Sequence, residues 1–245
     1  MTLASANHEF PRTRWTAVLR VRDGVVDPLG EKALAELCEM YWSPLFAFAR
    51  RCGHGAEDAE DLTQGFFTRL LARDLFAKAD PSRGRLRSFL LGAFKNYMSE
   101  EHRQAGRQKR GGNQVIVSID ELGWEVAADE GGEHDPAVDA ESLFDRVWFD
   151  TLLEHALAAL EQEYARRGKG ELFRRLQDFL AWNRKDGKLE EAARDLEMSP
   201  GALRVAILRM RHRFRELIER QIMETVQSPA EAAEEMQHLR RVLGA

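Results

Sequence analysis

Apolar residues recur at helical spacing in three segments of the first half of the chain. The first segment is expected to bend or break before Pro44, and the second starts just after the Gly53-His54-Gly55 turn. No β alternation of any length interrupts them, so the pattern predicts a helical bundle that ends near Gly111-Gly112. The three stripes consist of Leu34, Leu37, Cys38 and Tyr41; of Ala59, Leu62, Phe66, Phe67, Leu70 and Leu71; and of Leu86, Phe89, Leu90, Ala93, Phe94 and Tyr97.

The second half shows the same helical pattern after an interruption. Residues 113–142 lack helical periodicity and contain Gly, Asp and Pro, which is typical of a linker. The fold class predicted is therefore all-α, with two small helical domains over 10–112 and 146–222, an acidic linker over 113–145, and an amphipathic C-terminal extension over 223–245. The extension is expected either to fold back on the body or to bind a regulator. The apolar positions behind this prediction are Phe149, Leu152, Leu153, Ala156, Leu157 and Leu160, then Leu172, Leu176, Phe179 and Leu180, and in the extension Ala232, Met236, Leu239 and Leu243.

Two short helices with a tight turn are predicted after Asp186-Gly187. Ser199 suits the N-cap of the second helix, and Pro200 suits its first turn. The turn position held by Glu197 needs a positive φ, which costs a non-glycine residue roughly 1 kcal/mol. The pattern is that of a helix-turn-helix, although a purely structural helical hairpin has the same periodicity. Its apolar positions are Leu189, Ala192, Ala193 and Leu196, followed by Leu203, Ile207, Met210 and Phe214.

Charge is distributed unevenly along the 245 residues, beneath a net charge of −5. Residues 83–110 hold eight Lys or Arg and two Glu, and residues 204–220 hold six Arg and two Glu. Between them, residues 120–145 hold ten carboxylates and no Lys or Arg. This basic–acidic–basic order predicts two nucleic-acid contacts joined by a flexible anionic strap.

Several other classes of protein are not indicated. No apolar run approaches the roughly 20 residues that cross a bilayer, and residues 1–10 lack the pattern of a secretory signal, so a cytoplasmic protein without a membrane contact is expected. Cys38 and Cys52 provide neither a disulfide framework nor a zinc quartet. The seven His are scattered, and no catalytic set can be assembled, so we expect no metal, no cofactor and no enzyme activity.

Three segments together resemble the extracytoplasmic-function (group IV) sigma factors of bacterial RNA polymerase, within the sigma-70 family. DAEDLTQGFFTRLL (58–71) is similar to the region that docks on the polymerase clamp, and RSFLLGAFKNYMSEEHR (87–103) to the regions that melt and read the −10 element. LEEAARDLEMSPGALRVAILRMR (189–211) is similar to the region that reads the −35 element. The resemblance implies that the partners are core RNA polymerase, through the clamp of β′ and the flap of β, and promoter DNA. An anti-sigma factor or a kinase is a further possible partner.

The resemblance and the charge pattern together give three sets of candidate residues. The family commonly has Glu where this chain has Gly65, so one docking contact is missing. Thr63 lies in the docking segment, where phosphorylation would tune polymerase binding. For core polymerase the candidates are Asp58, Asp61 and Gln64; for the −10 element Arg85, Arg87, Lys95, Asn96, Arg103, Arg107, Lys109 and Arg110; and for the −35 element Ser199, Arg204, Val205, Arg209, Arg211 and Arg213. The aromatic residues of the second segment, including Phe89, favour the core over a stacking platform.

Alternatives remain open at this point. The acidic strap is either a nucleic-acid mimic, which also keeps the free protein from binding DNA tightly, or a solvated spacer. The whole chain is either a sigma factor or a one-component helix-turn-helix regulator with an N-terminal dimerisation or sensor domain. A helical scaffold without a DNA role is the third hypothesis. Binding to core polymerase distinguishes them, because a free-standing regulator binds its operator without it.

Overall fold

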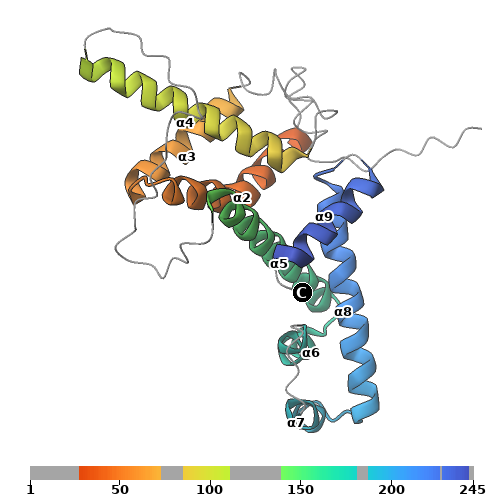
Figure 1. Cartoon of the computed structure of the whole chain (residues 1–245). Coiled ribbons are helices and arrows are strands. Elements are labelled where there is room, and N and C mark those ends of the chain that lie inside the picture. Colours follow the sequence, from red (N-terminus) through yellow and green to blue (C-terminus); the bar gives the residue numbers. More distant parts are fainter. Residues whose placement is uncertain (1–27, 73–84, 111–138, 181–186, 227, 243–245) are drawn as a thin grey trace, which may run out of the picture. The chain divides into compact units, whose positions relative to one another are not determined.

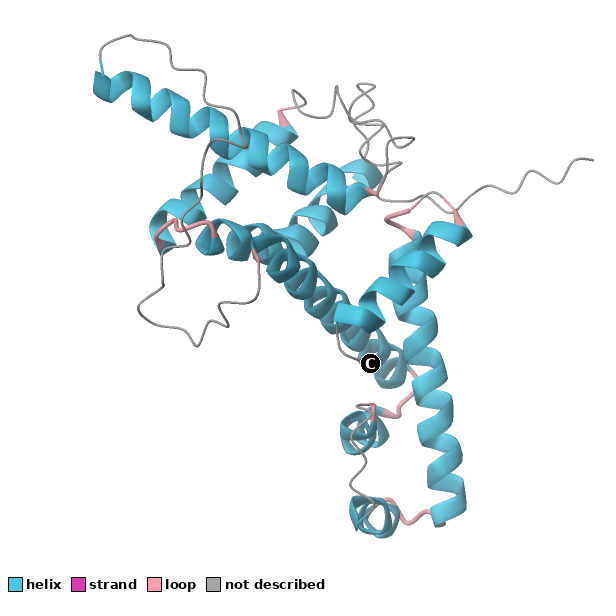
Figure 2. Cartoon of the chain, in the orientation of Figure 1, coloured by secondary structure: helices cyan, strands magenta, loops and turns pink. Residues whose placement is uncertain are grey.

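All regular elements in the described part of the chain are helices, which confirms the all-α prediction (Figures 1 and 2). The structure is a computed structural model that describes residues 28–72, 85–110, 139–180, 187–226 and 228–242. These residues form two compact units. The first unit contains the described residues up to Phe149 together with those from Met223 onward, and the second contains Asp150–Ile222. The helices are α2 Pro28–Arg51, α3 Ala56–Leu71, α4 Leu86–Arg110, α5 Ala140–Arg166, α6 Gly170–Leu176, a 3₁₀ turn Gln177–Phe179, α7 Gly187–Asp195, α8 Pro200–Met223 and α9 Pro229–Val242.

The core of the first unit is an aromatic cluster between α2, α3 and α4. The ring of Phe94 on α4 contacts Phe66 of α3 at a centroid distance of 5.2 Å and Phe48 of α2 at 6.2 Å. Helix α2 continues through Pro44, so of the expected bend or break before this residue the break does not occur. Both Pro44 and Leu45 are buried. Their packing against the core offsets the backbone hydrogen bond that a proline removes from a helix.

Helix α5 begins inside the segment predicted as the acidic linker. Asp139 caps it, since the backbone N–H of Ser142 donates to Asp139 Oδ1 at 2.7 Å. This hydrogen bond is the main reason why the pKa of Asp139 is lowered. Phe144, Trp148 and Phe149 follow at helical spacing and are buried in the first unit, where Trp148 stacks on Tyr41. Residues 140–145 are therefore helix, whereas linker residues 113–138 lie outside the described part.

The C-terminal extension belongs to the first unit. Ala232 and Leu239 of α9 are buried, as are Thr225 and Val226 before it. The backbone N–H of Leu86, at the start of α4, lies 3.5 Å from the carbonyl oxygen of Thr225. Of the two expectations for this segment, folding back on the body is the one that the structure contains.

The second unit contains the α7–turn–α8 pair. Glu197 has a φ of 52°, and it is the one non-glycine residue with a positive φ among the described residues, as predicted. The N–H of Met198 donates to the carbonyl of Ala193 and that of Glu197 to Arg194, which closes α7 with a Schellman motif. Ser199 Oγ then accepts from the N–H of Ala202 and caps α8, also as predicted. These local bonds fix the path between the two helices.

Candidate functional site

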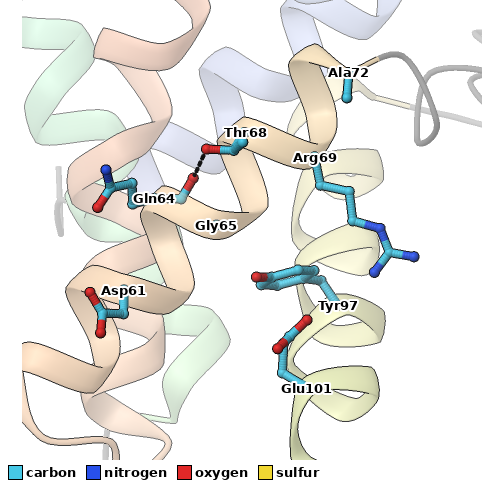
Figure 3. A pocket seen from close by; sticks show the side chains of 8 residues that line it. All are labelled: Asp61, Gln64, Gly65, Thr68, Arg69, Ala72, Tyr97 and Glu101. Carbon is cyan, nitrogen blue, oxygen red and sulfur yellow. Dashed lines mark hydrogen bonds between the residues drawn. The ribbon is translucent and has the colours of Figure 1, made fainter. Parts of the chain in front are cut away.

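The predicted polymerase-docking residues share one exposed face of α3. Asp58, Asp61 and Gln64 are all exposed, at a spacing of three residues. Asp61 and Gln64 line a hollow of about 450 Å³ between α3 and α4 (Figure 3). The opposite wall of this hollow was not predicted from the sequence. Its residues lie on α4, where the apolar stripe was assigned to the core and the basic segment to DNA binding. The wall includes Tyr97 and Glu101.

Gly65 lies directly against the side chain of Tyr97 at this hollow. A Cβ atom at Gly65 would lie 2.2 Å from the hydroxyl oxygen of Tyr97 and 3.3 Å from the ring carbon that bears it (Figure 3). Tyr97 is held by Arg69, whose guanidinium lies 5.8 Å from the ring centroid and pairs with Glu100 at 2.6 Å. Burial and the nearby Glu101 raise the pKa of Tyr97, so its hydroxyl stays protonated. A side chain at position 65 would therefore require Tyr97 to move.

We expect Gly65→Ala to lower the free energy of unfolding by roughly 1–2 kcal/mol, because overpacking outweighs the better helix propensity of alanine. Tyr97→Phe removes the hydroxyl that a Cβ would meet, so the double variant should recover most of this loss. Urea denaturation of the two single variants and the double variant measures the coupling. A Gly65→Ala effect that is unchanged in the Tyr97→Phe background would rule out this contact as its cause.

Thr63 is inaccessible, contrary to the hypothesis of a modification site. Its side chain has no exposed surface, and its hydroxyl donates to the carbonyl of Ala59 at 2.7 Å. A kinase would have to unfold α3 to reach it. Periodicity missed this because threonine was classed with the polar positions, although Thr63 faces the same side as Ala59, Phe66, Phe67 and Leu70.

Arg87 is not a surface residue, so its prediction as a −10 phosphate contact is wrong for this structure. Its side chain is 9% exposed, and its guanidinium pairs with Asp145 and with Glu235, the latter at 3.1 Å. Burial by itself lowers the pKa of Arg87, but the two carboxylates more than offset this and raise it. The guanidinium also lies 5.5 Å from the ring centroid of Trp148. This arginine is a buried part of the first unit.

The other −10 candidates differ in accessibility. Arg85 is partly exposed and pairs with Glu234 at 2.7 Å and with Glu235 at 2.9 Å. Lys95 pairs with Glu141 at the surface. Asn96 and Arg103 are exposed on α4, and Phe89 is half-buried. The candidates at the end of α4 have side chains outside the described part of the structure; these are Arg107, Lys109 and Arg110.

The −35 candidates divide into an exposed and an inward-facing group. Ser199, Arg204, Val205 and Arg209 are exposed. Leu208 is 68% exposed beside them, a residue that sequence reasoning missed although it falls outside the apolar stripe of α8. An exposed apolar side chain on a helix in the major groove is suited to contact with the methyl group of thymine.

Arg211 and Arg213, which the sequence predicts as DNA contacts, form hydrogen bonds within the second unit. Arg211 Nε donates to the carbonyl of Phe179 at 2.8 Å. Arg213 forms a two-pronged pair with Glu163, at 2.6 and 2.9 Å, and a further bond to Glu216. The hydrogen bond from Arg213 is the main reason why the pKa of Glu163 is lowered. Both arginines therefore hold α8 to neighbouring segments.

Comparison with known protein families gives one match, which lies in the first unit. Residues 37–108 match the family model described as Sigma-70 region 2. This segment is similar to sigma-70 region 2. The match covers α3 and most of α2 and α4, and thus the docking candidates and all −10 candidates except Lys109 and Arg110. It supports a role as a sigma factor of the sigma-70 family in transcription initiation. Curated proteins and solved structures gave no significant match. None of the described helices is both long enough and apolar enough to span a bilayer.

Proposed function

We propose that this protein is an alternative sigma factor of the extracytoplasmic-function group, which binds core RNA polymerase and directs promoter recognition and melting. The observation that carries the proposal is the sigma-70 region 2 match over residues 37–108. On this segment, the docking candidates Asp58, Asp61 and Gln64 are all exposed. In this role the chain is a specificity subunit rather than an enzyme.

Each unit has its own part in the proposal. In the first unit, the acidic face of α3 docks on the clamp of β′, while Asn96, Arg103 and the basic end of α4 hold the −10 strand. In the second unit, α8 enters the major groove of the −35 element with Arg204, Val205 and Arg209. The exposure of these three residues supports that assignment.

Binding to core polymerase is the decisive experiment. The purified protein is mixed with bacterial core polymerase, and the complex is tested by co-purification and by run-off transcription from genomic fragments. We expect a stable complex and discrete run-off products that core polymerase alone does not give. Specific binding to a DNA operator without any affinity for core polymerase would instead favour the helix-turn-helix regulator.

Arg204→Ala tests the −35 assignment. The substitution should cost roughly 1–3 kcal/mol at the matched promoter and relax the base preference at the position that Arg204 reads. Electrophoretic shifts with holoenzyme on a library of −35 variants measure both effects. Arg220→Ala, an exposed arginine near the end of the same helix, is the matched control. If Arg204→Ala left the base preference at every −35 position unchanged, Arg204 would not be one of the residues that read the −35 element.

A further inference from the structure

We propose that α9 and the first turns of α5 form an intramolecular clasp that competes with the −10 strand for the basic residues of α4. In the free protein the clasp occupies these residues, and α9 must leave them before they can hold DNA. The inference rests on the proposed function, since it concerns the regulation of the same −10 surface. We use the term carboxylate clasp for four residues, Glu141, Asp145, Glu234 and Glu235.

The clasp pairs with three cations at or near the start of α4, of which Arg85 and Lys95 are partly exposed and Arg87 is buried. Arg85 is paired with Glu234 and Glu235, at 2.7 and 2.9 Å. Arg87 is paired with Glu235 and Asp145, and Lys95 with Glu141. Asn96 and Arg103, further along the helix, remain exposed. The clasp therefore covers the cationic start of α4 and leaves the rest of the candidate surface open.

Carboxylates and phosphates compete for the same cations. The guanidinium fork of arginine binds either group in the same two-pronged manner. The affinity of a protein for single-stranded DNA rises with each phosphate that its cationic side chains neutralise. As long as Glu234 and Glu235 hold Arg85, this arginine contributes little to that gain. Removal of the two charges frees Arg85, while Arg87 keeps its pair with Asp145.

The contacts of α9 suit a reversible attachment. The helix has 14 residues, a length at which an isolated helix is marginal in water, so its order depends on docking. Its buried residues are Ala232, Glu235 and Leu239, of which one is a large apolar side chain. Glu235 is 1% exposed, yet its Oε2 atom has no hydrogen-bond partner among the described residues. An incompletely satisfied buried carboxylate weakens the docked state.

His238 connects α9 to the other half of the clasp. Its Nε2 atom lies 2.6 Å from Asp145 Oδ2, and its ring lies against Phe149 at a centroid distance of 5.6 Å. Asp145 thus contacts both Arg87 of α4 and His238 of α9. Because these contacts share one carboxylate, detachment of α9 also loosens the pair between α5 and α4.

The test compares the wild-type chain with Glu234→Gln/Glu235→Gln, which keeps the side-chain shapes and removes the charges. Binding of a fluorescein-labelled 20-nucleotide oligothymidylate is followed by fluorescence anisotropy over a range of salt concentrations. We expect the variant to bind about tenfold tighter near 0.1 M salt. The slope of log affinity against log salt should steepen by about 0.7, because the freed Arg85 neutralises one more phosphate.

A matched control separates release of the clasp from the general change in charge. Glu39→Gln/Glu161→Gln removes two exposed carboxylates elsewhere and should leave the salt slope unchanged. Adding Arg85→Gln to the clasp variant should abolish most of its gain. Circular dichroism verifies that each variant is folded.

Two outcomes distinguish the clasp from the proposed function. If a folded Glu234→Gln/Glu235→Gln variant binds the oligonucleotide with wild-type affinity and slope, the clasp is refuted, whatever the core-binding result. If the variant gains affinity through Arg85 but no preparation binds core polymerase, the clasp stands as a DNA-binding switch and the sigma factor proposal fails.

Discussion

The variant Asp61→Ala/Gln64→Ala is expected to lose at least about a hundredfold in affinity for core polymerase and to remain folded. Both side chains are exposed and line the hollow between α3 and α4, so their truncation leaves no buried group unpaired. In protein interfaces a few central residues cost about 2 kcal/mol or more each when truncated, and 1.4 kcal/mol is a factor of ten. Two such residues account for the expected loss. Fluorescence anisotropy with labelled protein and core polymerase measures it.

The matched control is Glu39→Ala/Gln237→Ala, which removes the same two kinds of group from exposed positions on α2 and α9. It should bind core polymerase like the wild type. Thermal unfolding should give the same midpoint for all three proteins within a few degrees. Wild-type affinity of the Asp61→Ala/Gln64→Ala variant would place the clamp contact on another surface of the first unit.

Local features of the fold could be predicted from the sequence because their causes are local. The N-cap at Ser199 and the positive φ of Glu197 depend on residues within one helical turn. The apolar stripes of α3 and α4 likewise identify Phe66, Phe94 and Tyr97 as core. Spacing and capping chemistry decide such features before any tertiary contact forms.

Features that depend on distant residues could not be predicted in this way. The partners of Arg87 lie 58 and 148 residues further along the chain, so a count of local charge grouped this buried arginine with exposed ones. The same count assigned Asp139, Glu141 and Asp145 to a flexible anionic strap. In the structure one of them caps α5 and the other two pair with α4. The signal that was available is the helical spacing of Phe144 and Trp148, immediately behind the acidic run.

Burial of Arg87 leads to the second large expected effect, which concerns stability. Arg87→Ala should lower the free energy of unfolding of the first unit by roughly 3–5 kcal/mol. This is the range for removing one partner of a buried ion pair, because Glu235 and Asp145 are left buried without their cation. Guanidinium chloride denaturation followed by circular dichroism measures this change.

Arg103→Ala is the control for this experiment, since Arg103 is an exposed arginine on the same helix. Its effect on stability should stay within about 0.5 kcal/mol. Arg87→Met should recover part of the loss, because a methionine side chain can still pack against Trp148, although both carboxylates remain unpaired. If Arg87→Ala instead left stability unchanged and weakened binding to single-stranded DNA, Arg87 would have to be a phosphate contact, and the ion pairs with Glu235 and Asp145 would not hold the fold together.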